Sequence, residues 1–124
     1  MSARIRLRRV YDPGTPEDGN RVLVDRLWPR GLRKDAVHLQ HWARELAPSD
    51  ELRKWFDHEV ERWPAFAERY RAELADHGDL LDLLLDIERQ HGTLTLLFAA
   101  RDDEHNEAEV IAGVLRDRPG HSHA

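Results

Sequence analysis

Polar and apolar residues alternate at the start of the chain. In residues 4–11, RIRLRRVY, arginine occupies every second position at first, with apolar residues between. This period of two predicts a strand with one solvent-facing side. Residues 12–20, DPGTPEDGN, are rich in turn formers and predict a loop. Residues 21–27 predict a second strand, and the run Val22-Leu23-Val24 within it indicates burial on both faces, as in a parallel or mixed sheet.

Helical spacing follows in the middle of the chain. Asp35 is placed to cap a helix that extends to about Ala47, because Leu39, Trp42, Ala43 and Leu46 would share one face. Pro48 ends this pattern. Ser49 is a good cap for a short second helix, whose first turn carries two acidic residues.

The remaining pattern alternates between helices and one apolar run. Residues 64–78 and 79–92 predict two helices, since a proline opens the first and a glycine ends each. Residues 93–99, TLTLLFA, predict a short buried strand. Residues 104–117 predict a last helix, and residues 118–124 a disordered tail.

The predicted order is therefore β-β-α-α-α-α-β-α. The helical stretch between the second and third strands is long enough to permit a right-handed crossover, and we expect these strands to be parallel neighbours. We expect one small α/β domain over residues 1–117, with a three-stranded or slightly larger, mostly parallel sheet and helices packed on it.

Composition narrows the classes of function. The chain has 124 residues, 35% of them charged, a net charge of −5 and no cysteine. The missing cysteine excludes disulfides and thiolate metal sites, and the acidic balance argues against a dedicated nucleic-acid binder. The apolar runs are too short to cross a bilayer, and the basic opening lacks the apolar stretch of a signal peptide. These features favour a cytoplasmic protein that is not bound to a membrane.

Polar clusters follow the second and third predicted strands. Residues 25–31, DRLWPRG, follow the second, and residues 101–106, RDDEHN, follow the third. Ligands of open α/β sheets bind beyond the carboxyl ends of parallel strands, where a helix that begins nearby also favours anions. The predicted site residues are Asp25, Arg26, Trp28, Arg30, Arg101, Asp102, His105 and Asn106.

These residue types suit a small anionic ligand with a phosphate or carboxylate, and they are compatible with a nucleotide-like one. The arginines would bind charge and Trp28 would pack on the ligand. His105 would donate or accept a proton, and Asp102 would orient it or bind a metal. The sequence identifies no cofactor, and it leaves open whether the protein is an enzyme.

Structural explanations account for the same residues. The acidic and basic groups could pair with one another and close the end of the sheet. Asp102 or Asp103 could be only a helix cap, and His105 could point to solvent. His38, His41 and Glu45 have a spacing that could hold a metal, but an exposed polar face explains them better, so no metal site is predicted.

A second hypothesis is a non-catalytic regulatory module. Aromatic and basic residues are interleaved in residues 46–56, LAPSDELRKWF, and in the helix that follows. Such a surface could bind a protein or a nucleic acid. A pocket flanked by the arginines at the end of the sheet would favour the first hypothesis over this one.

Four stretches resemble a known family: IRLRRVYDP, DGNRVLVDRLWPRGLRK, WARELAPSDELRKWFDHEVERWPAFAERYRAEL and TLLFAARDDEHNEAEVI. They are similar to the YeaO-like proteins of the domain-of-unknown-function 488 (DUF488) family over about residues 4–116. The resemblance implies a small cytoplasmic bacterial α/β protein. It implies no activity, because none is assigned to the family.

Overall fold

The computed structural model describes residues 4–37, 39–102 and 104–118. Its four-stranded sheet is parallel throughout, with the order β1-β4-β2-β3. The strands are β1 (Arg4–Arg9), β2 (Asn20–Leu23), β3 (His41–Trp42) and β4 (Thr93–Phe98). The prediction of a small, mostly parallel α/β sheet is confirmed, including the parallel pairing of the strands now labelled β2 and β4.

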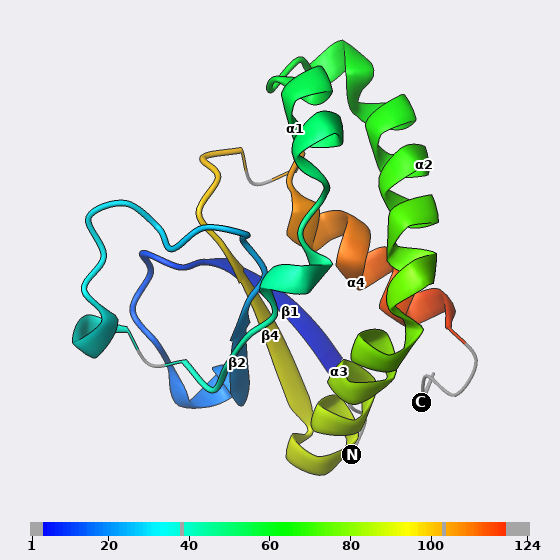
Figure 1. Cartoon of the computed structure of the whole chain (residues 1–124). Helices are drawn as coiled ribbons and strands as arrows, with labels where there is room; N and C mark the ends of the chain where they lie inside the picture. The colour runs from blue at the N-terminus through cyan, green and yellow to red at the C-terminus, as the bar shows by residue number, and fades with distance from the viewer. Residues whose placement is uncertain (1–3, 38, 103, 119–124) are drawn as a thin grey trace.

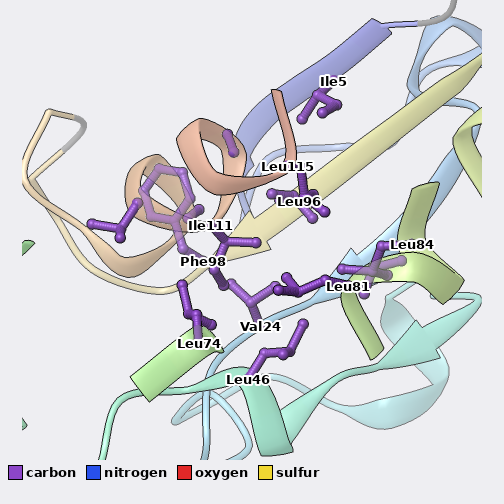
Figure 2. Close-up of a cluster of buried hydrophobic side chains, with 14 of the residues drawn as sticks. Ile5, Val24, Leu46, Leu74, Leu81, Leu84, Leu96, Phe98, Ile111 and Leu115 are labelled. Carbon is purple, nitrogen blue, oxygen red and sulfur yellow. The ribbon is translucent and has the colours of Figure 1, made fainter. Parts of the chain in front are cut away.

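The α-helices of the described residues all contribute to a core on one face of this sheet (Figure 1). They are α1 (Asp50–Phe56), α2 (Trp63–Leu74), α3 (Gly78–His91) and α4 (Glu107–Asp117). Alternate strand residues point toward them, so that Leu96 and Phe98 of β4 pack among Leu81, Ile111 and Leu115 (Figure 2). Removing this apolar surface from water is the main force that holds the helices on the sheet.

The opposite face is covered by irregular chain rather than by α-helices. The connection from β1 to β2 crosses β4 there, through the 3-10 helix η1 (Pro16–Asp18). Gly19 ends this crossing with a φ of +62°, and a Cβ on it would lie 2.6 Å from the carbonyl oxygen of Thr93. The crossing therefore lies so close to the sheet that only glycine fits at this point.

A smaller apolar cluster covers the carboxyl end of the same face. Val10, Leu23 and Leu97 are its buried members, and residues between β2 and β3 pack on them. Trp28 meets Trp42 edge-on, with ring centroids 5.4 Å apart. The segment that links β2 to β3 therefore has a packing role of its own.

The predicted helix from Asp35 to about Ala47 is wrong. The segment contains the 3-10 helices η2 (Lys34–Ala36) and η3 (Arg44–Leu46), with β3 between them. The free edge of β2 explains the difference, because the N–H of Gln40 donates to Arg21 and that of Ala43 donates to Leu23. Pairing with this edge satisfies backbone groups that a helix here would leave without partners.

Other boundaries move by a few residues. β2 ends at Leu23 rather than at residue 27, because the Asp25 carboxylate accepts a hydrogen bond from Ala99 N–H at 3.1 Å where the ladder would have continued. β1 ends at Arg9, and α4 begins at Glu107, three residues after the predicted start. Two further 3-10 helices, η4 (Val60–Arg62) and η5 (Ala75–His77), precede α2 and α3.

Candidate pocket at the carboxyl end of the sheet

A cavity of about 550 Å³ lies where β2 and β4 end and where α1 and α4 approach the sheet. Residues after β2 line it together with residues after β4, as the parallel pairing requires. The other walls come from the segment before α1, from α1 itself and from α2. Its lining residues are Asp25, Arg26, Leu27, Arg30, Ala47, Pro48, Arg53, Phe56, His58, Phe66, Ala99, Ala100, His105, Asn106 and Glu107.

Three arginines border this pocket, and the structure holds them differently. Arg26 donates to the carbonyl oxygens of Ala47 and Pro48 at 3.4 and 3.1 Å. Arg53 forms an ion pair of 3.2 Å with Asp50. Among the described residues the guanidinium of Arg30 has no hydrogen bond or ion pair, although its carbonyl accepts from the Tyr11 hydroxyl at 3.0 Å. Arg30 is therefore the least constrained of the three pocket arginines within the described part of the chain.

Two carboxyl groups meet inside the pocket. Asp25 follows β2, and Glu107 is the first residue of α4. Burial raises the pKa of Glu107 well above its ordinary value, and the hydrogen bond and negative charge of Asp25 raise it further. The raised pKa favours the protonated form of Glu107 over its carboxylate.

His105 also lines the pocket, and Asp102 holds its ring. The Nδ1 atom lies 2.9 Å from a carboxylate oxygen of Asp102, whose other oxygen accepts the backbone N–H groups of Glu104 and His105. The hydrogen bond from Glu104 N–H, followed by that of the His105 ring, lowers the pKa of Asp102. The negative carboxylate therefore favours the tautomer with its proton on Nδ1, and Nε2 is left as an acceptor. The ring also meets Trp63 edge-on at 5.2 Å.

The start of α4 differs from the expected anion site. Asn106 is the N-cap, and its side-chain oxygen accepts from the N–H of Glu109 at 3.1 Å. Its side-chain N–H₂ donates to the carbonyl of Asp102. The first turn of the helix also carries Glu109, an acidic residue of the kind that the positive helix end favours. The arginines are therefore the groups of this pocket that are suited to bind a negative charge.

Three predicted site residues lie outside the pocket lining: Trp28, Arg101 and Asp102, the last of which contacts the lining residue His105. Trp28 packs against Trp42, and its indole N–H donates to the carbonyl of Leu32 at 2.6 Å. Arg101 is exposed and has no hydrogen bond or ion pair with another described residue. The other predicted residues line the pocket: Asp25, Arg26, Arg30, His105 and Asn106.

The sequence did not single out several pocket residues. Glu107 was hidden because the last helix was expected to begin three residues earlier, which placed this glutamate inside it. Arg53, Phe56, His58 and Phe66 come from helices and a turn far from the strand ends in sequence. Phe56 and Phe66 stack at 4.5 Å and form an apolar wall. The aromatic spacing indicated a core here, which both rings join, and it gave no sign of a pocket.

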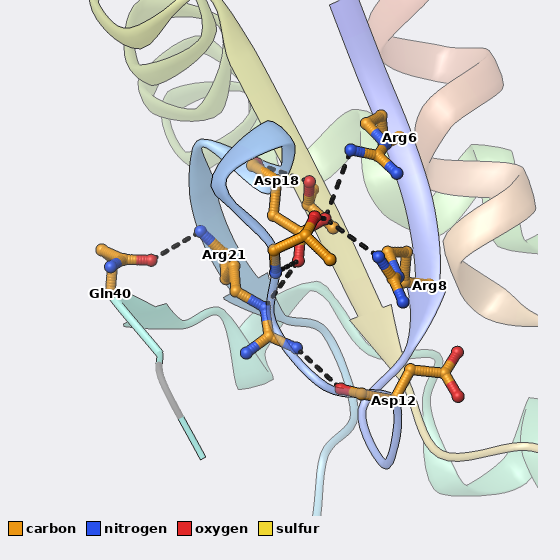
Figure 3. A network of polar contacts seen from close by, with 8 residues as sticks. Arg6, Arg8, Asp12, Asp18, Arg21 and Gln40 are labelled. Carbon is orange, nitrogen blue, oxygen red and sulfur yellow. Dashed lines mark hydrogen bonds and ion pairs between the residues drawn. The ribbon is translucent and has the colours of Figure 1, made fainter.

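A second polar cluster lies on the opposite face of the sheet (Figure 3). The buried carboxylate of Asp18 forms ion pairs with Arg6, Arg8 and Arg21, at 3.3, 3.4 and 3.3 Å. Burial alone would raise the pKa of Asp18, but hydrogen bonds from Thr15 and the charges of Arg8 and Arg21 outweigh it and lower that pKa. The arginine stripe of β1 is thus tied to the β1–β2 connection.

Metal-binding groups do not gather in the part of the chain that the structure describes. No set of three or more His, Asp or Glu side chains there is arranged to hold a metal ion. Of the residues with possible metal-binding spacing, His41 lies in β3 and Glu45 in η3, while His38 lies outside the described residues. Asp103 and the tail from residue 119 also lie outside them. No described helix is long and apolar enough to cross a membrane.

Comparison with known proteins places the chain among relatives without an assigned activity. The model of a family described as "Inactive DUF488-N3 subclade" matches residues 4–123. The uncharacterized protein YeaO of Escherichia coli is 47% identical over 112 residues, which cover 90% of this chain and 96% of the relative. The uncharacterized protein Rv3073c of Mycobacterium tuberculosis is 43% identical over 115 residues, with coverages of 93% and 96%. No solved structure matches.

Proposed function

The chain belongs to the DUF488 family, in the subclade described as inactive, and from this premise we propose that it binds a small anionic ligand at the carboxyl end of the sheet without transforming it. The observation that carries the proposal is the group of three arginines around one cavity of about 550 Å³. Guanidinium groups form forked hydrogen bonds to phosphate and carboxylate, and a partly enclosed site strengthens these contacts.

Arg30 is the main anion contact in this proposal. Arg26 and Arg53 share the carboxylate of Asp50, with distances of 3.8 and 3.2 Å, so part of their charge is already neutralised. Arg30 lines the pocket and forms no ion pair with a carboxylate of the described residues. Arg26 is also anchored by two carbonyl oxygens, which fixes its guanidinium beside the cavity. A fixed and a free arginine together suit an anion that enters from solvent.

In this proposal the His105 ring forms a hydrogen bond with the ligand, and Asp102 positions that ring. With Nδ1 directed at Asp102, the Nε2 atom is the ring nitrogen that can contact a ligand. An Asp–His pair of this kind would also suit acid–base catalysis. The description of the subclade as inactive supports a role in binding instead, in which the Nε2 atom of His105 forms a hydrogen bond with the ligand. Asn106 lines the same wall, but its cap bonds occupy its side chain.

The alternative, a protein- or nucleic-acid-binding surface on residues 46–56, has less support. Trp55 would be the natural stacking platform of that surface. Arg69 already lies over its ring at 4.2 Å and Arg62 at 5.5 Å, so the ring has cationic partners within the chain. We further propose a bacterial, cytoplasmic protein, because both relatives named above are bacterial and the chain has no cysteine for disulfides.

Thermal unfolding with a panel of small phosphates and carboxylates tests the proposal. A ligand at ten times its Kd stabilises the folded state by about 1.4 kcal/mol, which raises the melting temperature by a few degrees. We expect at least one compound to stabilise the wild type and Arg33→Ala, but not Arg30→Ala. Arg33 is a matched control because it is exposed, pairs with Asp35 and lies outside the pocket. The proposal would be contradicted if the compounds stabilised Arg30→Ala and Arg33→Ala equally. It would also be contradicted if no compound stabilised the wild type.

A further inference from the structure

The turn after α1 holds two successive non-glycine residues in the left-handed region of backbone conformation. Asp57 has a φ of 46° and His58 has a φ of 57°. Helices commonly end on one left-handed residue, and Asp57 fills that role, because its N–H donates to the carbonyl of Arg53 at 3.1 Å. The end of the helix does not require the second left-handed residue, and side chains other than glycine occupy this region at a cost.

The backbone of this turn does not explain why residue 58 is a histidine. The N–H of Glu59 closes the turn by donating to the carbonyl of Phe56 at 2.9 Å. Glycine would adopt the same φ more readily, because it has no Cβ. The imidazole is therefore what His58 contributes beyond the turn itself. Residues held in sparsely populated backbone regions cluster at ligand-binding sites, where the side chain that they present contacts the ligand.

The ring of His58 lies at the pocket, and its nitrogens are available to a ligand. His58 lines the cavity together with Arg30 and Arg53. Its ring contacts that of Phe56, with centroids 6.4 Å apart, and neither ring nitrogen forms a hydrogen bond or ion pair with a described residue. An imidazole carries at least one N–H in both its neutral and its charged form. His58 can therefore donate to an anion in either form.

The donors of the pocket come from separate elements of the fold. Arg30 lies on the segment after β2, whereas Arg53 lies on α1 and His58 on the turn that follows it. A carboxylate has two oxygens in one plane, which a single forked guanidinium can occupy. A phosphate monoester has three terminal oxygens and up to two negative charges, so it can accept from both elements at once. The raised pKa of Glu107 favours the neutral form of this acid, which limits the negative charge that such a ligand meets.

We infer that the pocket takes a phosphate monoester, and that His58 is a ligand-contacting residue that donates to the phosphoryl group together with Arg30 and Arg53. This inference rests on the proposed function and makes its ligand class more specific. The cavity of about 550 Å³ has room for a phosphoryl group and an attached carbon body. Phe56 and Phe66 supply apolar surface for that body.

Matched anions test the ligand class on the intact wild-type chain. Propyl phosphate and pentanoate share an alkyl body and differ in the anionic group, and phenyl phosphate and phenylacetate form the same comparison with an aryl body. One additional hydrogen bond to a charged group corresponds to about tenfold in affinity. We therefore expect NMR titration to show that the phosphate binds tighter than the carboxylate by about tenfold in at least one pair.

Glycine variants of the turn test the role of His58. His58→Gly removes the ring and suits the left-handed φ, so its melting temperature should stay within a few degrees of that of the wild type. Its affinity for the phosphate that binds should fall about tenfold, because one donor is lost. Asp57→Gly is the matched control, since Asp57 shares the left-handed backbone but does not line the pocket, and it should keep the wild-type affinity. His58→Asn tolerates the same φ and retains a donor, so its affinity should be intermediate.

The outcomes separate this inference from the proposed function. If the carboxylate binds as tightly as the phosphate in both pairs, the phosphate class is overturned while anion binding stands. If His58→Gly keeps the wild-type affinity for the phosphate, or if Asp57→Gly loses as much, the role of His58 is overturned. If no anion binds the wild type, both proposals are overturned. Should His58→Gly not fold, the ligand pairs on the wild type still decide the class, and the affinity of His58→Asn decides the role of His58.

Discussion

Asp25, which follows β2, and Glu107, which opens α4, line the same cavity, and Asp25 raises the pKa of Glu107. The two residues are far apart in sequence and meet because β2 and β4 are parallel neighbours that end at the same edge. A strand end and a helix start therefore contribute acidic groups to one cavity.

The raised pKa of Glu107 makes the stability of the fold depend on pH in a defined direction. In the folded protein Glu107 keeps its proton at pH values above the ordinary glutamate pKa of 4.5, whereas the unfolded chain releases it there. The free energy of unfolding therefore falls as the pH rises from about 4.5 towards the raised pKa of the folded protein. We expect the free energy of unfolding of the wild type to fall by up to about 1.4 kcal/mol per pH unit relative to Glu107→Gln. Urea unfolding from about pH 5 to about pH 8 measures this difference.

The control for that measurement is Glu109→Gln, which changes a nearby acid of the same helix turn without changing Glu107. Its stability should follow the wild-type pH profile. Parallel pH profiles for the wild type and Glu107→Gln would contradict the raised pKa of Glu107 in the folded protein.

The ion cluster on the other face predicts a large loss of stability. Asp18→Asn removes the buried carboxylate that Arg6, Arg8 and Arg21 share, and with it the negative charge at the centre of this cluster. We expect a loss of about 3 kcal/mol or more in the free energy of unfolding. Asp86→Asn is the matched control, since Asp86 pairs with Arg89 in an exposed i,i+3 contact, and should cost less than about 0.5 kcal/mol. Similar losses in both variants would contradict this prediction.

The same cluster has the opposite pH dependence from Glu107. Because the folded pKa of Asp18 lies below its ordinary value of 3.8, its contribution is complete above that value and is lost as the pH falls through the lowered one. Acid unfolding of Asp18→Asn should therefore be less steep than that of the wild type. Circular dichroism during an acid titration gives both slopes, and equal steepness would exclude this role of Asp18.

The contact between Asp102 and His105 predicts a tautomer. In the neutral ring of the wild type the proton should reside on Nδ1, where it is donated to the Asp102 carboxylate at 2.9 Å. In Asp102→Ala this preference should be lost. Long-range nitrogen–proton NMR correlation distinguishes the two ring nitrogens, and an Nε2-protonated ring in the wild type would refute the assignment.

Arg101 should tolerate substitution. It is exposed, lacks a partner among the described residues and does not line the pocket. Arg101→Ala should therefore change the free energy of unfolding by less than about 0.5 kcal/mol and should leave ligand stabilisation intact. A loss of stabilisation by ligand in this variant alone would bring Arg101 back into the site.

The sheet was predictable because its signals are local. The apolar runs of β2 and β4 identify buried strands, and the long helical segment between them requires a crossover and hence a parallel pair. The segment 35–47 was misread because its apolar spacing fits a helix equally well. The deciding factor was the free edge of β2, which lies outside the segment itself.

The pocket was predictable as a place more than as a set of contacts. Because parallel strands end at the same edge of the sheet, the backbone alone brings Arg30 and His105 to one cavity. The orientation of each side chain is decided by packing that the sequence does not display. Trp28 turned toward Trp42 and away from the cavity, whereas Glu107 turned into it.

The position of β4 has a consequence for synthesis of the chain. It pairs with both β1 and β2, yet it is the last strand in the sequence. Until residues 93–98 have been made, β1 has no strand beside it, and β2 has only the two-residue β3. The nascent chain must therefore hold its early strands unpaired, and a product that terminates before Thr93 would expose them to aggregation.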